Sequence, residues 1–184
     1  EQLAEIEAIA GQSDAPTFEN TIVAMEKSGQ LLNRVATVFY SLASAHTNDS
    51  LEAVRSEMAP KLSAHSDQIL LNSNLFERIR TLYDQKTSPG FDAEAVRLVE
   101  ETYKDFTRAG ANLSADDKER LKAINAELAT QQTTFSQNVL KEVNDLAVVV
   151  DSREELTGLS EAMIEAAAKE AESRNLTGKY VITL

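Results

Sequence analysis

The chain has 184 residues, 42% of them hydrophobic and 26% charged, which fits one water-exposed globular domain. Its formal net charge of −12 is divided evenly, −6 in residues 1–92 and −6 in residues 93–184, so it offers no basic patch for nucleic acid or an anionic membrane surface. The absence of cysteine excludes a disulfide scaffold, and no apolar run reaches the roughly 20 residues that a membrane-spanning helix needs, so we expect a cytoplasmic protein.

Residues 16–46 predict two helices. Pro16 and Thr17 mark a helix start, because proline is excluded from helix interiors and threonine is a good N-cap. Gly29 separates this helix from the next. The first helix has apolar residues at helical spacing, namely Phe18, Ile22 and Met25. The second has two such lines: one is Leu31, Val35, Val38 and Leu42, and the other is Leu32, Phe39 and His46.

Two further helices follow before residue 90. Asn48 or Asp49 can cap the first of these, and we expect Pro60 to kink or split it near Met58. After a break at residues 72–74, a fourth helix runs to about residue 85, and residues 87–90 form a loop. The predicted apolar positions are Leu51, Val54, Met58, Leu62, His65 and Ile69 in the third helix and Leu75, Ile79 and Leu82 in the fourth.

Asp92 caps a helix that ends at Gly110, and Ser114 precedes a long helix over residues 115–144. The apolar positions of the earlier helix are Ala95, Leu98, Thr102, Phe106 and Ala109. The predicted core face of the long helix is Leu121, Ile124, Leu128, Phe135 and Val139, with Gln131 and Gln132 facing a neighbour or water.

The last forty residues predict a strand over 146–150, a helix from Ser160 to about Arg174, and a strand over 179–184. This order permits a small parallel pair of strands. The predicted fold class is therefore mainly α: an antiparallel multi-helix bundle with a minor two-strand β element near the C-terminus. We expect a helical bundle over residues 1–144, extended by a strand-helix-strand segment of the same domain over 145–184 that is truncated at its C-terminal end.

Four stretches of the chain, residues 16–49, 95–114, 121–140 and 158–171, resemble the N-terminal helical region of the thimet-oligopeptidase family of zinc metallopeptidases. The likeness is greatest to the bacterial peptidyl-dipeptidases. It implies a parent enzyme that removes C-terminal dipeptides from oligopeptides, in which the helical front half covers a deep channel. The resemblance also implies that the intact parent binds zinc through an H-E-x-x-H helix and a further glutamate.

No H-E-x-x-H is present in this sequence, whose two histidines, His46 and His65, are not followed by glutamate. We therefore expect a non-catalytic, channel-covering domain with no catalytic, cofactor-binding or metal-binding residue of its own. Its partners would be the C-terminal catalytic portion and the oligopeptide substrate. Dipeptide-releasing and internally cleaving parents both remain open. The alternative is a stand-alone helical protein-interaction module without enzymatic activity.

Several residue groups resemble catalytic or metal sites, but each has a structural explanation. A zinc pair of His46 and His65 would need a third ligand such as Asp49 or Asp67, and histidines on apolar helix stripes are usually structural. Adjacent acids on a helix diverge by about 100° and do not face each other. This applies to the acid pairs Glu100-Glu101 and Asp116-Asp117. No G-x-S-x-G elbow surrounds any of Ser41, Ser44, Ser63 and Ser66.

Two further groups have structural explanations. A structural role suffices for Phe18, Glu19, Asn20 and Thr21. Core packing is favoured over lining a peptide channel for Tyr103 and Phe106, and solvation is favoured for Arg108.

Overall fold

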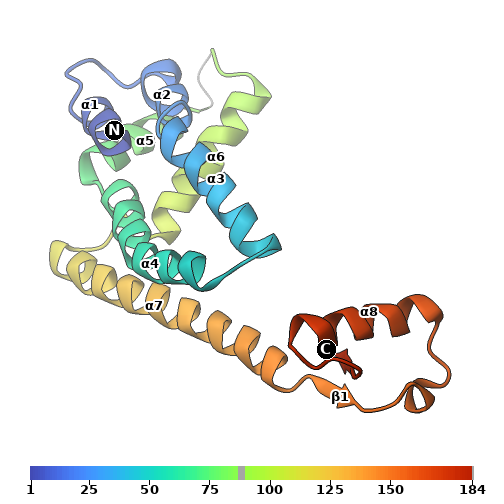
Figure 1. Cartoon of the computed structure of the whole chain (residues 1–184). Helices are drawn as coiled ribbons and strands as arrows, with labels where there is room; N and C mark the ends of the chain where they lie inside the picture. Colours follow the sequence, from blue (N-terminus) through green and yellow to red (C-terminus); the bar gives the residue numbers. More distant parts are fainter. Residues whose placement is uncertain (87–89, 184) are drawn as a thin grey trace. The chain divides into compact units, whose positions relative to one another are not determined.

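A computed structural model describes residues 1–86 and 90–183 (Figure 1). The chain divides into two compact units, residues 1–133 and residues 134–184, and each is described by itself. The domain division expected at residues 144 and 145 stays a prediction. Of the loop expected at residues 87–90, only Gly90 lies within the described residues.

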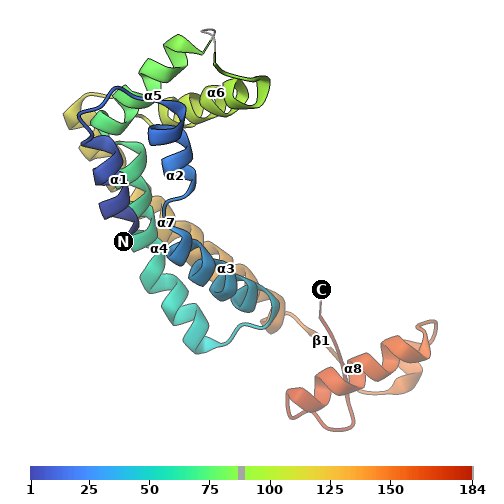
Figure 2. The same cartoon turned by 90° about the horizontal axis from the view of Figure 1, so that it is seen from above.

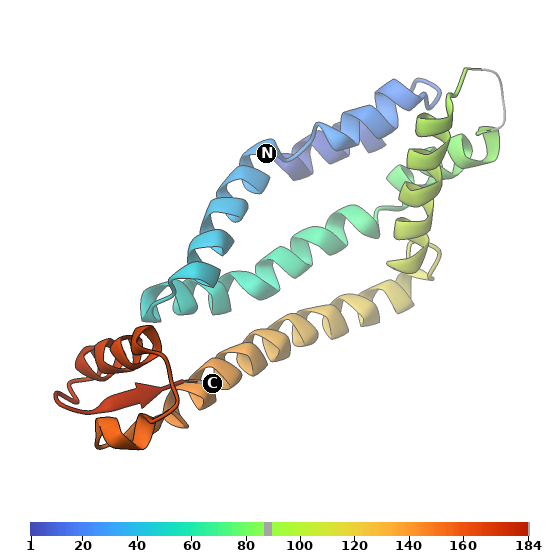
Figure 3. The same ribbon diagram turned by 90° about the vertical axis from the view of Figure 1, so that its right-hand side faces the viewer.

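The first unit is built from helices. In chain order these are α1 (Gln2–Ala10), the π-helical turn η1 (Phe18–Val23), α2 (Ala24–Glu26), α3 (Gln30–Ala45), α4 (Asp49–Leu70), α5 (Ser73–Gln85), α6 (Ala93–Arg108) and the first part of α7 (Ala115–Asp145). Figures 1 and 3 show α4 between α3 and this part of α7. The predicted fold class, mainly α with a two-strand β element near the C-terminus, is confirmed.

Most of the predicted helix starts are confirmed by side-chain caps. Thr17 and Asn20 form a capping box, in which Thr17 Oγ1 accepts from the Asn20 N–H at 3.0 Å and Asn20 Oδ1 accepts from the Thr17 N–H at 2.8 Å. Asn48, Asn72 and Asp92 each accept a hydrogen bond from the backbone N–H three residues later. These local bonds fix where each helix begins.

The core of the first unit lies where α1, η1, α5 and α6 meet (Figure 2). Leu75, Ile79 and Val99 are completely inaccessible to solvent, as the apolar spacing of α5 and α6 demands. Phe76 stacks on Phe106, with ring centroids 6.4 Å apart. The full set of buried core residues is Ile6, Ile9, Ala10, Ile22, Leu75, Phe76, Ile79, Leu82, Val99, Phe106 and Ala111.

Pro60 does not divide its helix, so of the predicted kink or split the split is wrong, and the kink stays a prediction. The helix α4 continues from Asp49 to Leu70 with Pro60 inside it. A proline removes one backbone donor from a helix. The remaining hydrogen bonds of this helix of 22 residues keep it continuous despite that loss.

The second unit comprises the end of α7, β1 (Val148–Val150), the 3₁₀ turn η2 (Arg153–Leu156), α8 (Glu161–Ser173) and β2 (Tyr180–Ile182). Ser160 caps α8 as predicted, since its hydroxyl accepts from the Met163 N–H. The buried side chains that hold this unit together are Leu156, Ile164, Ala167, Ala171 and Val181.

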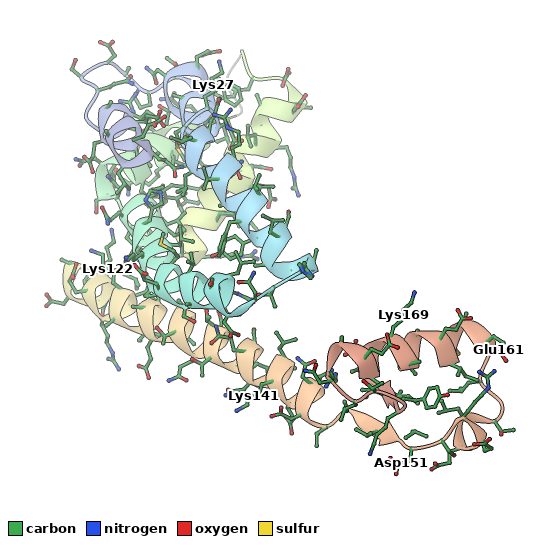
Figure 4. All side chains as sticks on the ribbon, viewed as in Figure 1. Lys27, Lys122, Lys141, Asp151, Glu161 and Lys169 are labelled. Atoms are coloured by element: carbon green, nitrogen blue, oxygen red, sulfur yellow. The ribbon has the colours of Figure 1, made fainter. Side chains whose placement is uncertain are left out.

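The two strands pair antiparallel, with Val149 opposite Val181, so the predicted parallel pair is wrong. The physical reason lies in the connection, because η2 and α8 return the chain to the end of β1. An ion pair between the flanking residues shows the result. Asp151, which follows β1 and is labelled in Figure 4, forms an ion pair of 2.8 Å with Lys179, which precedes β2. The end of β1 therefore lies beside the start of β2, as only antiparallel pairing allows.

Candidate functional site

The four candidate zinc ligands, His46, Asp49, His65 and Asp67, are either exposed to solvent or hydrogen-bonded to other side chains. His46 and Asp49 are exposed. His65 Nε2 lies 2.7 Å from Gln2 Oε1, a hydrogen bond that joins α4 to α1. Asp67 is buried and accepts a hydrogen bond of 2.7 Å from Asn125. Each half-buried or buried member thus has a structural partner.

The donor groups of this chain do not fit a zinc centre. Zinc in proteins needs at least three clustered ligands, usually histidine, cysteine or carboxylate. Within residues 1–86 and 90–183, no group of three or more such side chains is placed to hold a metal ion. The expectation that this chain binds no zinc stays a prediction.

The adjacent acids are held by neighbouring cations and hydroxyls. Glu100 lies 3.8 Å from Lys86 Nζ, and Glu101 forms ion pairs with Arg97 at 2.9 Å and Lys104 at 3.2 Å. The hydrogen bond from Lys104, assisted by the charge of Arg97, holds the pKa of Glu101 below its ordinary value. An exposed carboxylate with a lowered pKa is ionised at neutral pH and is a poor general acid.

The second acid pair and the serines have helical roles. The Ser114 hydroxyl donates to Asp117 Oδ2 at 2.7 Å, and the Asp117 N–H donates back to Ser114 at 3.2 Å, which fixes the start of α7. Asp116 is exposed in the same first turn. The four candidate serines lie inside α3 and α4 rather than at a turn between a strand and a helix: Ser41, Ser44, Ser63 and Ser66.

The aromatic candidates pack as side chains of the first unit. Tyr103 stacks on Tyr83 with ring centroids 4.0 Å apart, and Phe106 is buried. Arg108 is exposed at the rim of a shallow hollow of about 480 Å³ on α6. Packing for the aromatic rings and solvation for the arginine were the expected roles, and the positions of these residues agree with them.

Sequence reasoning missed two buried cations. Arg78 of α5 is 7% exposed and holds the loop between α1 and η1, since Nη1 donates to the Asp14 carbonyl at 2.9 Å and Nη2 donates to Asn20 Oδ1 at 2.8 Å. Lys118 of α7 donates to the Leu71 carbonyl at 3.0 Å and to Ser73 Oγ at 2.9 Å. Lys118 thereby satisfies the last turn of α4, whose carbonyls attract positive charge.

One signal could have drawn attention to Arg78. It lies three positions after Leu75 and four before Leu82, on the apolar side of α5, where a charged side chain is unexpected unless it has partners. No comparable signal exists for Lys118. Its partners lie more than forty positions away in the chain, which a local sequence pattern does not encode.

The largest departure from the sequence prediction is an apolar surface on α3. We define the α3 stripe as Leu31, Val35, Val38 and Leu42, which were predicted to form an apolar line. In the structure these four side chains are between 48% and 58% exposed, whereas Ala43 is the buried residue of α3. Fully burying such side chains stabilises a protein by about 1.5–3 kcal/mol each, so the α3 stripe leaves a large favourable free energy unused.

Four of the five residues of the predicted core face of α7 are also exposed, so that prediction is wrong for them, whereas Leu121 is half-buried. Ile124 and Leu128 lie in the first unit and are 45% and 49% exposed. Phe135 and Val139 lie in the second unit and are exposed as well. The spacing of apolar residues identifies the apolar side of a helix but does not supply the partner that covers it. Gln131 and Gln132 are exposed.

The chain is similar to curated peptidases over nearly its whole length, although no family model matches it. It is 40% identical over 181 residues to a dipeptidyl carboxypeptidase of Escherichia coli, a match that covers 98% of this chain and 27% of the relative. It is 27% identical over 168 residues to oligopeptidase A of Haemophilus influenzae, covering 91% of this chain and 24% of that protein. It is 26% identical over 171 residues to a thimet-like oligopeptidase of Dictyostelium discoideum, with similar coverage.

The chain thus spans about a quarter of the length of the curated relatives it matches. Within the described part of the chain, no helix has both the length and the apolar character needed to cross a bilayer. Each of these relatives is named as a peptidase. Most of each relative's polypeptide lies outside the matched region.

Proposed function

We propose that the chain belongs to the peptidase family that includes dipeptidyl carboxypeptidase and oligopeptidase A, and that it is the N-terminal helical region of a longer zinc-dependent peptidyl-dipeptidase. Such an enzyme removes C-terminal dipeptides from oligopeptides. The observation that carries this proposal is the 40% identity over 98% of the chain to a dipeptidyl carboxypeptidase, compared with 27% to an oligopeptidase A.

Within that enzyme we assign this region a covering and positioning role rather than a catalytic one. Support comes from the side chains that could have done chemistry. His65 and Asp67 are bound to Gln2 and Asn125, and Glu101 is held ionised by Lys104 and Arg97. In this proposal the zinc and the water-activating group belong to polypeptide outside the matched quarter. The cytoplasmic location and the absence of nucleic-acid and membrane partners stay predictions.

A second candidate function is a stand-alone helical interaction module. One observation favours it: the α3 stripe is an exposed apolar surface of the kind that mediates protein contacts. Such a module would work without peptidase activity of any linked segment. The two candidates therefore differ in whether this chain can replace the matched part of a working peptidase.

A chimera tests the proposed function. The segment of the Escherichia coli dipeptidyl carboxypeptidase that this chain matches is replaced by residues 1–184, and the same relative with that segment deleted is the control. Release of a C-terminal dipeptide from an N-acetylated tetrapeptide is measured by mass spectrometry. We expect the chimera to release the dipeptide and the deletion control to have lost most of this activity. A folded but inactive chimera would favour the interaction module.

The isolated chain tests the non-catalytic assignment. We expect it to release no dipeptide from the same peptide and to contain no stoichiometric zinc by elemental analysis. Hydrolysis by the isolated chain that a chelator abolishes would overturn the assignment.

A further inference from the structure

We propose that the α3 stripe is an interface on which an apolar helix from outside this chain packs in the intact peptidase. This inference rests on the proposed function. It goes further by naming the surface of this region that contacts the rest of the enzyme.

The exposure of the α3 stripe is the first argument. Its four side chains recur at helical spacing, so they form one continuous line along α3. A neighbouring face of the same helix packs inside the first unit through Leu32, Phe39 and Ala43, which are half-buried or buried. The helix therefore has two apolar faces, and the residues that the structure describes bury one of them.

The charge of α3 is the second argument. Arg34 is the single charged residue among its sixteen positions, although 26% of the whole chain is charged. A helix face that stays in water normally carries Lys, Arg, Glu or Asp, often as pairs one turn apart. The lack of such charges on α3 favours an apolar partner helix. A charged partner helix would find only Arg34 to pair with.

The shape of the surface at the start of α3 is the third argument. Leu31, Leu32 and Val35 line a hollow of about 370 Å³ together with Gln2 and His65. Glu1 and Gly29 also line it, and two of its polar side chains are paired with each other, because His65 Nε2 lies 2.7 Å from Gln2 Oε1. An apolar side chain that enters this hollow therefore meets a histidine and a glutamine that already have a hydrogen-bond partner.

The lengths of the relatives identify the occupant. The match covers 27% of the Escherichia coli relative, so about three quarters of that polypeptide is available to pack against the matched part. The α3 stripe extends over about 16 Å at 1.5 Å per residue, which corresponds to three turns of a partner helix. We therefore commit to a helix of the remaining polypeptide, and a second copy of this chain becomes an outcome of the test.

Cysteine labelling provides the test, because the chain contains no cysteine of its own. Val35→Cys places a thiol in the α3 stripe. Ser44→Cys places one on the opposite side of α3, since nine positions at about 100° each amount to two and a half turns of helix. Both positions are exposed. The rate of alkylation by iodoacetamide at each position is followed by peptide mass spectrometry, in the isolated chain and in the chimera described above.

We expect Val35→Cys to react readily in the isolated chain and at least about tenfold more slowly in the chimera, because a buried thiol reacts only during local opening. The rate at Ser44→Cys should be similar in both. Val38→Cys repeats the measurement within the α3 stripe if Val35→Cys does not fold, and circular dichroism melting verifies folding of each variant.

The outcomes separate this inference from the proposed function. Equal labelling of Val35→Cys in an active chimera would overturn the interface and leave the proposed function standing. Protection in a folded but inactive chimera would support the interface and count against the proposed function. Protection in the isolated chain that grows with its concentration would identify a second copy as the occupant, and equal protection at Ser44→Cys would contradict a one-sided surface.

Discussion

Helices α3 and α5 have the same kind of sequence pattern and different surroundings. Both have apolar residues three and four positions apart, yet Ile79 of α5 is 0% exposed while Val38 of α3 is 58% exposed. The difference arises because α1 and α6 pack over α5, whereas the part of the chain that the structure describes offers no cover for the α3 stripe. An apolar pattern thus establishes that a face needs a partner, and the partner has to be found separately.

Shortening one apolar side chain in each helix tests this comparison, and it has the largest expected effect on the free energy of unfolding. Ile79→Ala should destabilise the isolated chain by about 2–5 kcal/mol, because it leaves a cavity in the core. Val38→Ala should change stability by no more than about 0.5 kcal/mol, because the side chain is already in water. Urea unfolding followed by circular dichroism measures both, and equal losses would show that α3 is covered in the isolated chain.

Arg78 and Arg80 sharpen the comparison within α5. Arg78→Met should destabilise the chain by about 1.5–3 kcal/mol, since the Asp14 carbonyl and the half-buried Asn20 Oδ1 lose a charged donor. Arg80→Met is the matched control, because Arg80 is exposed and bonds Glu77 one turn away. Its loss should be below about 1 kcal/mol in the same urea titration. A reversed order would refute the role given to Arg78.

Lys118 and Lys122 provide an equivalent pair on the first part of α7. Lys118→Met should cost about 1–3 kcal/mol, because the carbonyl of Leu71 and the hydroxyl of Ser73 lose a buried donor. Lys122, labelled in Figure 4, pairs with Glu119 at the surface, and Lys122→Met should be nearly neutral. Thermal melting of the two variants in parallel checks the difference, and a neutral Lys118→Met would contradict the cap on α4.

The smallest expected effect concerns the pH dependence at Glu101. Its pKa is lowered in the folded chain, so it binds a proton less readily when folded than when unfolded. Its contribution to stability is therefore present above the unfolded pKa and is lost as pH falls through the lower, folded pKa. Glu101→Gln should slightly reduce the loss of melting temperature between neutral and acidic pH. An increased loss would contradict the lowered pKa.

Local features of the fold could be predicted from the sequence. Thr17, Asn48, Asp92 and Ser160 are residues that the sequence predicts as caps, and each accepts a hydrogen bond from a backbone N–H three residues later. Asn72, in a segment predicted only as a break, is a cap of the same kind. The long helix from residue 115 was likewise predicted to within one residue of its observed end. These features depend on neighbours within one turn of helix.

Features that depend on distant neighbours could not be predicted. The antiparallel pairing of β1 with β2 depends on how the intervening turn and helix return the chain, and the buried roles of Arg78 and Lys118 depend on partners more than forty positions away. The exposure of Leu31 and Ile124 has another cause. Their apolar positions were correctly identified, but the residues that the structure describes do not cover them.

The most direct test of the whole account is dipeptide release from the blocked tetrapeptide, measured side by side for the isolated chain and for the chimera. The account predicts release by the chimera and none by the isolated chain, because it proposes that the reacting groups lie outside the region that this chain matches. Chelator-sensitive release by the isolated chain would contradict it.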